Sequence, residues 1–413
     1  MNIVCVGGGP AGLYFAISAK LRDQNHRITV VERNPKGVTY GWGVTFSEVL
    51  LDSLYRNDQV SAQEIALNPA SWGNQEVRVR GNRPVHLGGY GYAVGRQLLL
   101  DILTRRAREL GVDVQFGREI GDVSGFAHAD LVVASDGAGS RVRQLHAEHF
   151  RTDTEVCRNK YIWLGAHRVF DSFVFAFEQT AAGWIWFYAY RFNADTTTFI
   201  VECSPTTWER LGFDVLGPDE SLRLLEDIFK RHLDGHSLIN PMRNLGKTPW
   251  LNFVRISNTA WYHDNVVLMG DAAHTTHFSI ASGTTLARQD AIALATALHE
   301  HAELRAALEA YQDQRRTALL RPQGAALNST RWFENVTQYL GAEPTQFAYD
   351  LWKRRGHYPL WRYQLHLATQ VAALRKLRCS LSATRRELRA RRRAKLADPG
   401  RRATPAVGAN RQR

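Results

Sequence analysis

The amino-acid sequence predicts an α/β (α+β) fold, in which a parallel sheet is interrupted by an inserted antiparallel sheet and followed by a helical region. Apolar runs that end in glycine or aspartate occur near residues 1, 130 and 265, as is typical of buried parallel strands. Residues 161–202 instead contain four strand-like segments in succession. After residue 302 the pattern becomes helical.

The first apolar run, residues 2–6, is followed by a glycine-rich turn and then by a helix predicted over residues 13–21. The turn reads Gly7-Gly8-Gly9-Pro10-Ala11-Gly12. Gly7 permits the tight turn, Gly9 lets the backbone approach a pyrophosphate, and Gly12 lets helix and strand pack closely. The phosphates are then expected at the helix N-terminus.

A second strand, over residues 27–31, ends at Glu32, twenty residues beyond Gly12. Its carboxylate is placed to accept hydrogen bonds from a ribose hydroxyl pair. Strand, glycines, helix, strand and acid in this order predict a dinucleotide site, but they do not distinguish FAD from NAD. The alternative is a glycine-rich loop that serves only packing.

Two later strand ends favour FAD. Asp136 follows a predicted strand over residues 130–134, and residues 265–269 lead into Gly270 and Asp271. An acid at the carboxyl end of a parallel strand faces the ligand crevice, so Asp271 is placed to accept from a ribityl hydroxyl. Gly283 and Thr284 then open a helix over residues 286–299, whose positive end is expected to face the flavin ring. For each motif alone, an aspartate that caps a turn is the alternative.

The inserted sheet is predicted from strands at residues 161–169, 172–179, 183–190 and 196–202. One face is expected to roof the substrate over the flavin, with its aromatic side chains serving packing more than ring binding. His277 lies in the loop expected near the flavin ring and is the candidate for a polar or acid–base role. A loop histidine satisfied by the backbone is the alternative.

These patterns divide the chain into five parts. Residues 1–157 and 256–300 form a Rossmann-like FAD-binding domain, 158–255 the antiparallel substrate-binding sheet, 301–380 the C-terminal helices, and 381–413 a basic, partly disordered tail. Within the C-terminal part, helices are expected at residues 302–318, 330–340, 345–354 and 361–377. Residues 384–396 can continue as a helix, and 398–413 are expected to be mobile.

The charge of the chain is concentrated in its tail. The 413 residues include 52 Lys and Arg against 40 Asp and Glu, a net charge of +12. Residues 375–413 hold fourteen basic and two acidic residues, so the other 374 residues are neutral. This excludes a nucleic-acid-binding body and leaves polyanion binding to the tail.

The remaining composition bears on location and on metals. There is no apolar run of about 20 residues that would span a membrane, and no secretory signal is visible. The four cysteines lack C-x-x-C spacing, so neither a disulfide framework nor a metal site is expected. The sequence therefore predicts a cytoplasmic protein, in which cysteines stay reduced.

With these motifs the sequence resembles the single-component FAD-dependent aromatic hydroxylases, the group that includes 4-hydroxybenzoate hydroxylase. In that family the Asp-Gly motif serves both FAD and the nicotinamide donor, and an arginine that opens a mid-domain helix contacts FAD. Arg96, in Gly95-Arg96-Gln97-Leu98-Leu99, matches that arginine. The resemblance implies a monooxygenase reduced by NADH or NADPH that binds transiently. Arg33 and Val44 complete the expected FAD-binding residues.

Further motifs resemble a narrower branch, which includes salicylyl-CoA 5-hydroxylase, 2-aminobenzoyl-CoA monooxygenase and the violacein-pathway hydroxylase. They are Tyr40-Gly41-Trp42-Gly43-Val44, Arg158-Asn159-Lys160-Tyr161-Ile162-Trp163, Thr198-Phe199-Ile200-Val201-Glu202-Cys203-Ser204 and His277-Phe278-Ser279-Ile280. The resemblance implies hydroxylation of an aromatic acyl thioester, foremost salicylyl-CoA at C5, through a flavin C4a-hydroperoxide.

Two alternatives remain open, and a third is disfavoured. One is a different aromatic substrate, either 2-aminobenzoyl-CoA or an indole-derived intermediate. Another is a protein that binds polyanions through its tail. A flavin halogenase is disfavoured, because residues 184–188 do not match the Trp-x-Trp-x-Ile-Pro signature. The oligomeric state stays open, with a homodimer as one option.

Overall fold

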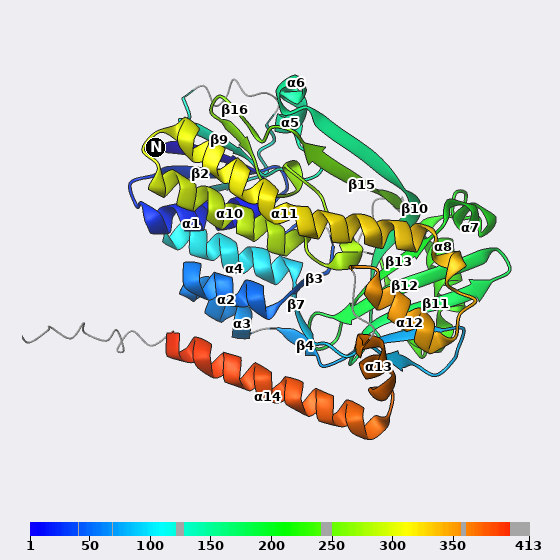
Figure 1. Cartoon of the computed structure of the whole chain (residues 1–413). Helices are drawn as coiled ribbons and strands as arrows, with labels where there is room; N and C mark the ends of the chain where they lie inside the picture. The colour runs from blue at the N-terminus through cyan, green and yellow to red at the C-terminus, as the bar shows by residue number, and fades with distance from the viewer. Residues whose placement is uncertain (40, 68, 121–127, 241–249, 357–360, 397–413) are drawn as a thin grey trace, which may run out of the picture.

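The structure is a computed structural model, and it describes residues 1–39, 41–67, 69–120, 128–240, 250–356 and 361–396. Its elements form a parallel sheet at one end of the molecule and an antiparallel sheet at the other (Figure 1). The mixed α/β class that the sequence predicts is therefore confirmed.

The six-stranded sheet has the order β16-β17-β9-β1-β2-β8. Its central strands are parallel, and only β16 runs antiparallel to its neighbour. The carboxyl ends of β1, β9 and β17 therefore meet at one edge, although these strands lie far apart in the sequence. The strands are β1 (Asn2–Val6), β2 (Arg27–Glu32), β8 (Asp113–Phe116), β9 (Leu131–Ala134), β16 (Tyr262–His263) and β17 (Val266–Leu268).

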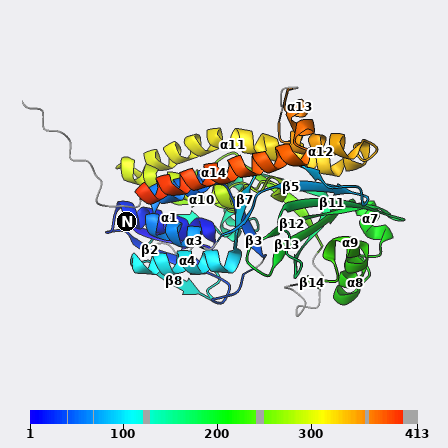
Figure 2. The same ribbon diagram turned by 90° about the horizontal axis from the view of Figure 1, so that it is seen from below.

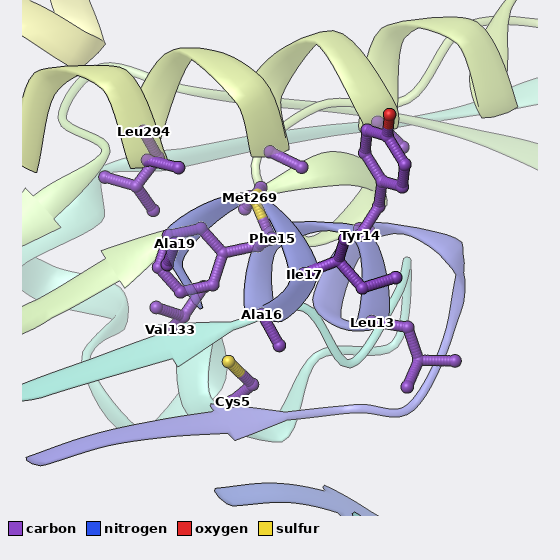
Figure 3. Close-up of a cluster of buried hydrophobic side chains, with 14 of the residues drawn as sticks. Cys5, Leu13, Tyr14, Phe15, Ala16, Ile17, Ala19, Val133, Met269 and Leu294 are labelled. Atoms are coloured by element: carbon purple, nitrogen blue, oxygen red, sulfur yellow. The ribbon is translucent and has the colours of Figure 1, made fainter. Parts of the chain in front are cut away.

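Helices α1 and α10 pack against each other beside this sheet and share its core. Phe15 of α1, Val133 of β9 and Leu294 of α10 are fully buried there (Figure 3). The helices of this half are α1 (Pro10–Arg22), α4 (Arg96–Glu109), α5 (Arg141–Leu145), α6 (Ala147–Phe150) and α10 (Gly283–Glu300), with 3-10 turns η3 (Gly270–Ala272) and η4 (Phe278–Ile280) before α10.

The larger sheet has the order β14-β10-β13-β12-β11-β5-β6, with β15 beside β10. The four strands expected from the sequence are present as β10 to β13, and they pair antiparallel in chain order except for β10, which joins β13. The strands are β5 (Gln75–Val79), β6 (Val85–His86), β10 (Thr152–Ala166), β11 (Phe173–Thr180), β12 (Gly183–Arg191), β13 (Thr197–Cys203), β14 (Leu238–Ile239) and β15 (Leu251–Asn258).

The expected boundaries at residues 157 and 255 both fall inside strands. β10 and β15 pair from Thr152 opposite Asn258 to Tyr161 opposite Leu251, so they form one ribbon that crosses both positions. In addition, β5 from the first part of the chain pairs in parallel with β11. These pairings join segments distant in sequence, and local patterning does not report them.

The two faces of the larger sheet pack against different helices. One face contacts α7 (Pro205–Arg210), α8 (Pro218–Ile228) and α9 (Lys230–Leu233), with Phe187 and Phe229 in the core between them. The other face carries Trp186 and Tyr188 and packs against α11 and α12 (Pro344–Lys353). The aromatic side chains of the sheet are therefore mostly core residues.

Helix α11 corrects one prediction. The sequence suggests separate helices at residues 302–318 and 330–340, whereas α11 is one helix, Leu304–Glu334, followed by the 3-10 turn η5 (Val336–Gln338). It continues through Pro322, which removes a backbone donor and would ordinarily weaken the helix. Its first half packs into the core of the parallel sheet and its second half into that of the larger sheet, so burial at both ends holds it together.

Smaller elements lie between the two halves. A three-stranded sheet has the order β3-β7-β4 and is flanked by two short helices. These elements are β3 (Gly43–Phe46), β4 (Ala70–Trp72), β7 (Gly91–Gly95), α2 (Glu48–Asn57) and α3 (Gln59–Leu67).

The C-terminal helices differ from the expected division at residues 380/381. Residues 361–377, expected as one helix, are split between α13 (Trp361–Ala368) and α14 (Ala372–Leu396), and α14 crosses the expected boundary without a break. Figures 1 and 2 show α14 along the outside of the molecule. Residues 398–413, expected to be mobile, lie outside the described residues. No helix in the described ranges is long and apolar enough to cross a membrane.

Candidate functional site

A cavity of about 280 Å³ lies at the edge where the parallel strands end. Its walls come from the turn after β1, the residues after β2, β9 and β17, and the first turns of α4 and α10. The sequence-predicted residues that line it are Gly7, Gly9, Pro10, Ala11, Glu32, Arg33, Arg96, Asp136, Asp271, Gly283 and Thr284.

The glycines of the first turn have different roles. Gly7 has φ +106°, and a Cβ added there would lie 2.5 Å from the Ser135 carbonyl oxygen. A Cβ on Gly12 would lie 2.2 Å from the Gly7 carbonyl oxygen, so both positions need glycine for backbone packing. A Cβ on Gly9 would meet no atom within 4 Å, because Gly9 faces the cavity.

The space beside Gly9 suits an anion. α1 begins at Pro10, and its N-cap residue Gly9 offers no side-chain cap, so the backbone N–H groups of the first turn remain for another acceptor. Helix N-termini of this kind bind phosphate groups. A methyl group on Gly9 would occupy the space that such a group needs.

Glu32 is held in place at one end of the cavity. Its Oε2 accepts a hydrogen bond of 2.8 Å from the Gly8 backbone N–H. Its Oε1 accepts from the backbone N–H and the side-chain Nδ2 of Asn34, at 2.9 and 2.7 Å. These bonds fix the carboxylate while leaving lone pairs for hydroxyl donors of a ligand.

Asp136 combines the two functions considered for it. Its Oδ2 accepts from the backbone N–H groups of Arg141 and Val142, at 2.7 and 3.3 Å, and so caps α5. Its Oδ1 is buried and has no hydrogen-bond partner among the described residues. A buried acceptor without a partner is costly, so a donor from a ligand in the adjoining cavity would satisfy it.

Asp271 and Arg96 both line the cavity, and their opposite charges attract each other. Protein atoms crowd the Asp271 carboxyl although it opens into the cavity, and this desolvation raises its pKa, with nearby His274 and Arg96 opposing the shift. Desolvation likewise lowers the pKa of Arg96, against the attraction of Asp271 and Glu32. Arg96 opens α4, and its Nε donates to Thr39 Oγ1 at 3.0 Å.

The N-terminus of α10 forms another wall of the cavity. Gly283 and Thr284 line it, and a Cβ on Gly283 would meet no atom within 4 Å. Ser282 precedes the helix without capping it, since its hydroxyl lies 3.0 Å from that of Thr276. The positive end of α10 therefore faces the cavity, where it favours negative charge on a ligand.

Three predicted FAD-binding residues do not line the cavity. Gly12 packs behind the turn, and Val44 is buried in β3. Gly270 has φ +61°, and its N–H donates to Asp290 Oδ2 at 3.1 Å, so it shapes the turn that presents Asp271.

The structure also adds lining residues that sequence reasoning missed. The Ser135 hydroxyl donates to the carbonyl oxygens of Val6 and Gly7, at 2.9 and 3.1 Å, and so braces the glycine turn. Its position directly before Asp136 is the one feature of the sequence that could have indicated that Ser135 lines the site. The others include Arg118, Glu119 and Ile120, which follow β8, and Arg141 and Leu145 of α5.

His277 is buried next to η4 and is not among the described residues that line the cavity. Its Nδ1 accepts from the Ser279 backbone N–H at 3.3 Å and lies 2.8 Å from the Ser279 hydroxyl. Burial, with Arg354 nearby, lowers its pKa to about 3. A lowered pKa favours the neutral imidazole near pH 7, whose remaining ring N–H is a very weak acid, and this argues against a general-acid role.

A buried hydrogen-bond network around Glu202 lies in the larger sheet, and the sequence did not indicate it. Glu202 is 1% exposed, and its carboxylate accepts from Asn159 Nδ2 at 2.7 Å, Trp186 Nε1 at 3.3 Å and the Tyr188 hydroxyl. Burial nevertheless raises its pKa to about 7. A charged residue inside an aromatic strand pattern gives no local sign of this network.

Comparison with known proteins identifies the family. The FAD binding domain family matches residues 1–321. Salicyloyl-CoA 5-hydroxylase from Streptomyces sp is 37% identical over 366 residues, which cover 86% of this chain and 70% of that protein.

Two other relatives share most of their length with this chain. One is 3-hydroxy-4-methyl-anthranilyl-[aryl-carrier protein] 5-monooxygenase from Streptosporangium sibiricum, which is 34% identical over 88% of this chain and 96% of that protein. The other is protodeoxyviolaceinate monooxygenase from Chromobacterium violaceum, which is 30% identical over 87% of this chain and 96% of that protein.

A solved structure shares the fold. The tetrameric form of 2-methyl-3-hydroxypyridine-5-carboxylic acid oxygenase superposes with a TM-score of 0.67 at 19% identity, over 86% of this chain and 95% of the other. The glycine turn, the acids at the strand ends and these similarities agree. The chain belongs to the FAD binding domain family and is an FAD-dependent aromatic monooxygenase.

Proposed function

We propose that this enzyme uses NADH or NADPH and O₂ to hydroxylate an aromatic acyl thioester, foremost salicylyl-CoA at C5. The observation that carries the proposal is the pair of relatives at 37% and 34% identity, both named for 5-hydroxylation of an aryl thioester. In a salicylyl or anthranilyl group, position 5 is para to the hydroxyl or amine at position 2. Electron donation from that substituent makes this carbon the nucleophilic one.

The cavity would hold FAD in an extended arrangement. Glu32 would hold the adenosine ribose, the N-terminus of α1 beside Gly9 the pyrophosphate, and Asp271 the ribityl chain. Arg96, which interacts electrostatically with Asp271 and Glu32, would balance the negative charge that the FAD phosphates add. FAD would supply the reduction and activation of oxygen, for which the chain's own side chains have no chemistry.

The protein's own contribution is orientation and exclusion of water. The N-terminus of α10 would stabilise negative charge beside Gly283 and Thr284. Phe278 packs against Tyr161 and Tyr188 of the larger sheet, with ring centroids 4.8 and 5.6 Å apart, and closes the region between η4 and the sheet. Apolar packing of this kind would keep water out of the region, and exclusion of water protects a reactive oxygen species from loss.

His277 would act as a positioning residue. Its ring lies 4.2 Å from that of Phe278 and 4.9 Å from that of Phe253, and its Nδ1 is bonded to Ser279. It would therefore hold Phe278 against the sheet without exchanging a proton.

A second substrate class is an indole-derived intermediate, favoured by the 30% identity to protodeoxyviolaceinate monooxygenase. The non-enzymatic alternative, polyanion binding through the tail, remains only as an additional property. Arg389 and Arg393 of that segment are already paired with Glu48 and Asp52 within the chain.

The deciding experiment measures oxidation of NADH and of NADPH by the FAD-loaded enzyme, with product analysis. The substrates are salicylyl-CoA, free salicylate, 2-aminobenzoyl-CoA and an indole. Salicylyl-CoA should stimulate oxidation and yield a 5-hydroxylated product. Stimulation by free salicylate but not by its thioester would reject the proposal, and preference for the indole would favour the second class.

A further inference from the structure

A narrow row of leucines runs along the outward side of α14. Leu374, Leu377, Leu381 and Leu388 are 46%, 57%, 55% and 54% exposed. Their spacing of three, four and seven residues places them within an arc of about 60° on a helix with 3.6 residues per turn. We call these four residues the α14 seam. A stripe this narrow is typical of helix pairing, whereas helices that lie on membranes present a broader apolar face.

An adjacent side of α14, about 60–100° around the helix from Leu374, is fixed to the rest of the molecule. Arg393 is 7% exposed, and its Nε donates to Asp52 Oδ1 at 2.6 Å. Arg389 Nη1 donates to Glu48 Oε2 at 2.5 Å. Glu48 is 4% exposed and also accepts from the Tyr90 hydroxyl at 2.7 Å. Because these contacts set the rotation of the helix, the seam stays on the outside.

Charge determines what kind of helix can pair with the seam. α14 contains ten basic residues and one acidic residue, Glu387. Arg385 and Arg392 are exposed and, at 100° per residue, lie within about 20° of Leu374 on the helix surface. Pairing α14 with a second copy of itself would place these cations against one another, whereas an acidic partner is attracted.

The chemistry of the proposed substrate suggests which acidic partner applies. A thioester substrate is carried either by free CoA, which needs no protein-docking surface, or by a carrier protein. One relative at 34% identity is named for a substrate held on an aryl-carrier protein. Only a carrier protein would need the α14 seam and the arginines beside it.

We infer that α14 is the docking surface for an acidic helical carrier protein that holds the aromatic acyl group as a thioester. A helix of the carrier packs its apolar residues on the α14 seam and its carboxylates against Arg385 and Arg392. The inference rests on the proposed hydroxylation of an aromatic acyl thioester, and it adds a carrier protein to CoA as a holder of the acyl group.

Binding tests the surface independently of catalysis. The probe is a fluorescently labelled aryl carrier protein without an acyl group, titrated with full-length FAD-loaded enzyme and followed by anisotropy. The double variant Leu377→Ser with Leu381→Ser removes the apolar seam and keeps its charge. The variant Arg385→Gln with Arg392→Gln does the reverse. Each should weaken binding about tenfold or more, and salt should weaken only the binding that retains the arginines.

A control is Leu320→Ser, which removes an even more exposed leucine, 68% exposed, from α11. It should leave binding unchanged. Equal carrier binding by the wild type and both seam variants would overturn the inference. So would seam-dependent binding to phosphatidylglycerol vesicles without carrier binding, or a seam-dependent dimer in sedimentation, because these assign the surface to a membrane or to a second copy.

Kinetics separate this inference from the proposed function. With salicylate on the carrier protein, both double variants should raise KM about tenfold or more at unchanged kcat. With salicylyl-pantetheine, which lacks the protein, they should match the wild type. Failure of every enzyme to hydroxylate both salicylyl-pantetheine and salicylyl-CoA would reject the proposed function, while the binding result would still decide the docking surface.

Discussion

At the residue scale, two glycines of the first turn differ in what surrounds them. A Cβ on Gly9 would project into the cavity, and one on Gly12 would collide with the Gly7 carbonyl oxygen. We expect Gly9→Ala to fold normally but to bind FAD at least tenfold more weakly, because the methyl group takes space beside the helix N-terminus. Gly12→Ala should instead destabilise the fold by about 1–3 kcal/mol.

The measurements are FAD titration by fluorescence and urea denaturation of the apoprotein, with the two variants serving as controls for each other. An unchanged FAD affinity in Gly9→Ala would contradict the assignment of the pyrophosphate to this turn. Unchanged stability of the Gly12→Ala apoprotein would contradict its packing role.

Glu202 predicts a pH dependence of stability. Burial raises its pKa from 4.5 to about 7 in the folded protein, so the native state holds the proton more tightly than the unfolded chain. The contribution of Glu202 to the free energy of unfolding is fully present below about pH 4.5 and is lost as pH rises through about 7. The total loss is about 3 kcal/mol, taking 1.36 kcal/mol for each pKa unit.

We therefore expect Glu202→Gln, which cannot ionise, to lose about 3 kcal/mol less stability than the wild type between pH 4 and pH 9. Urea denaturation of both proteins at the two pH values measures this difference. Every other titrating group is common to the two proteins and cancels. Parallel stability curves for wild type and variant would show that Glu202 does not titrate in this range.

At the element scale, ion pairs hold α14 on α2. Glu48 has only 3% of its side chain exposed and contacts both Arg389 and Arg393. Removing both arginines by Arg389→Ala with Arg393→Ala leaves that carboxylate buried without a cation. We expect a loss of about 2 kcal/mol, toward the low end for broken buried pairs because Arg389 is half exposed and Tyr90 still donates.

Hydrogen exchange with mass spectrometry measures the effect, because amides of α14 should exchange faster once its anchor is removed. The exposed pair Arg385→Ala with Arg392→Ala is the control and should change stability by no more than about 0.5 kcal/mol. Equal protection of α14 in both variants would show that apolar contacts, not the ion pairs, hold the helix.

At the scale of the whole molecule, FAD binding and folding should be linked. The cavity takes residues from β1, β2, β9 and β17 together with α4 and α10, so a bound ligand ties the strands of the parallel sheet to the helices around it. At a free FAD concentration of 100 times Kd, stability should rise by about 2.7 kcal/mol. FMN, which lacks the adenosine that would reach Glu32, should stabilise less at equal concentration.

Thermal unfolding over a series of FAD and FMN concentrations tests this. The unfolding temperature should rise continuously with FAD concentration, since only the native state holds the assembled cavity. Equal stabilisation by FMN and FAD would mean that the Glu32 end of the cavity takes no part in binding.

Much of the candidate site could be predicted from the sequence because its signals are local. A glycine with positive φ, such as Gly7, and an acid directly after a strand, such as Asp271, depend on a few neighbouring residues. Ser135 and Arg118 line the same cavity, but a serine after a strand and an arginine in a loop are too common to stand out. Glu202 was missed because its three donors come from other parts of the chain.

The sequence by itself determined the α/β class, the glycine turn, the strands that end in Asp136 and Asp271, and the family resemblance, because each depends on short segments whose backbone geometry restricts the residue type. Only the tertiary structure decided that β10 and β15 form one ribbon, that α11 continues through Pro322, and that α14 docks on α2 with its leucines outward. These features are pairings between distant residues, and their free energy comes from burial and charge that exist only in the folded chain.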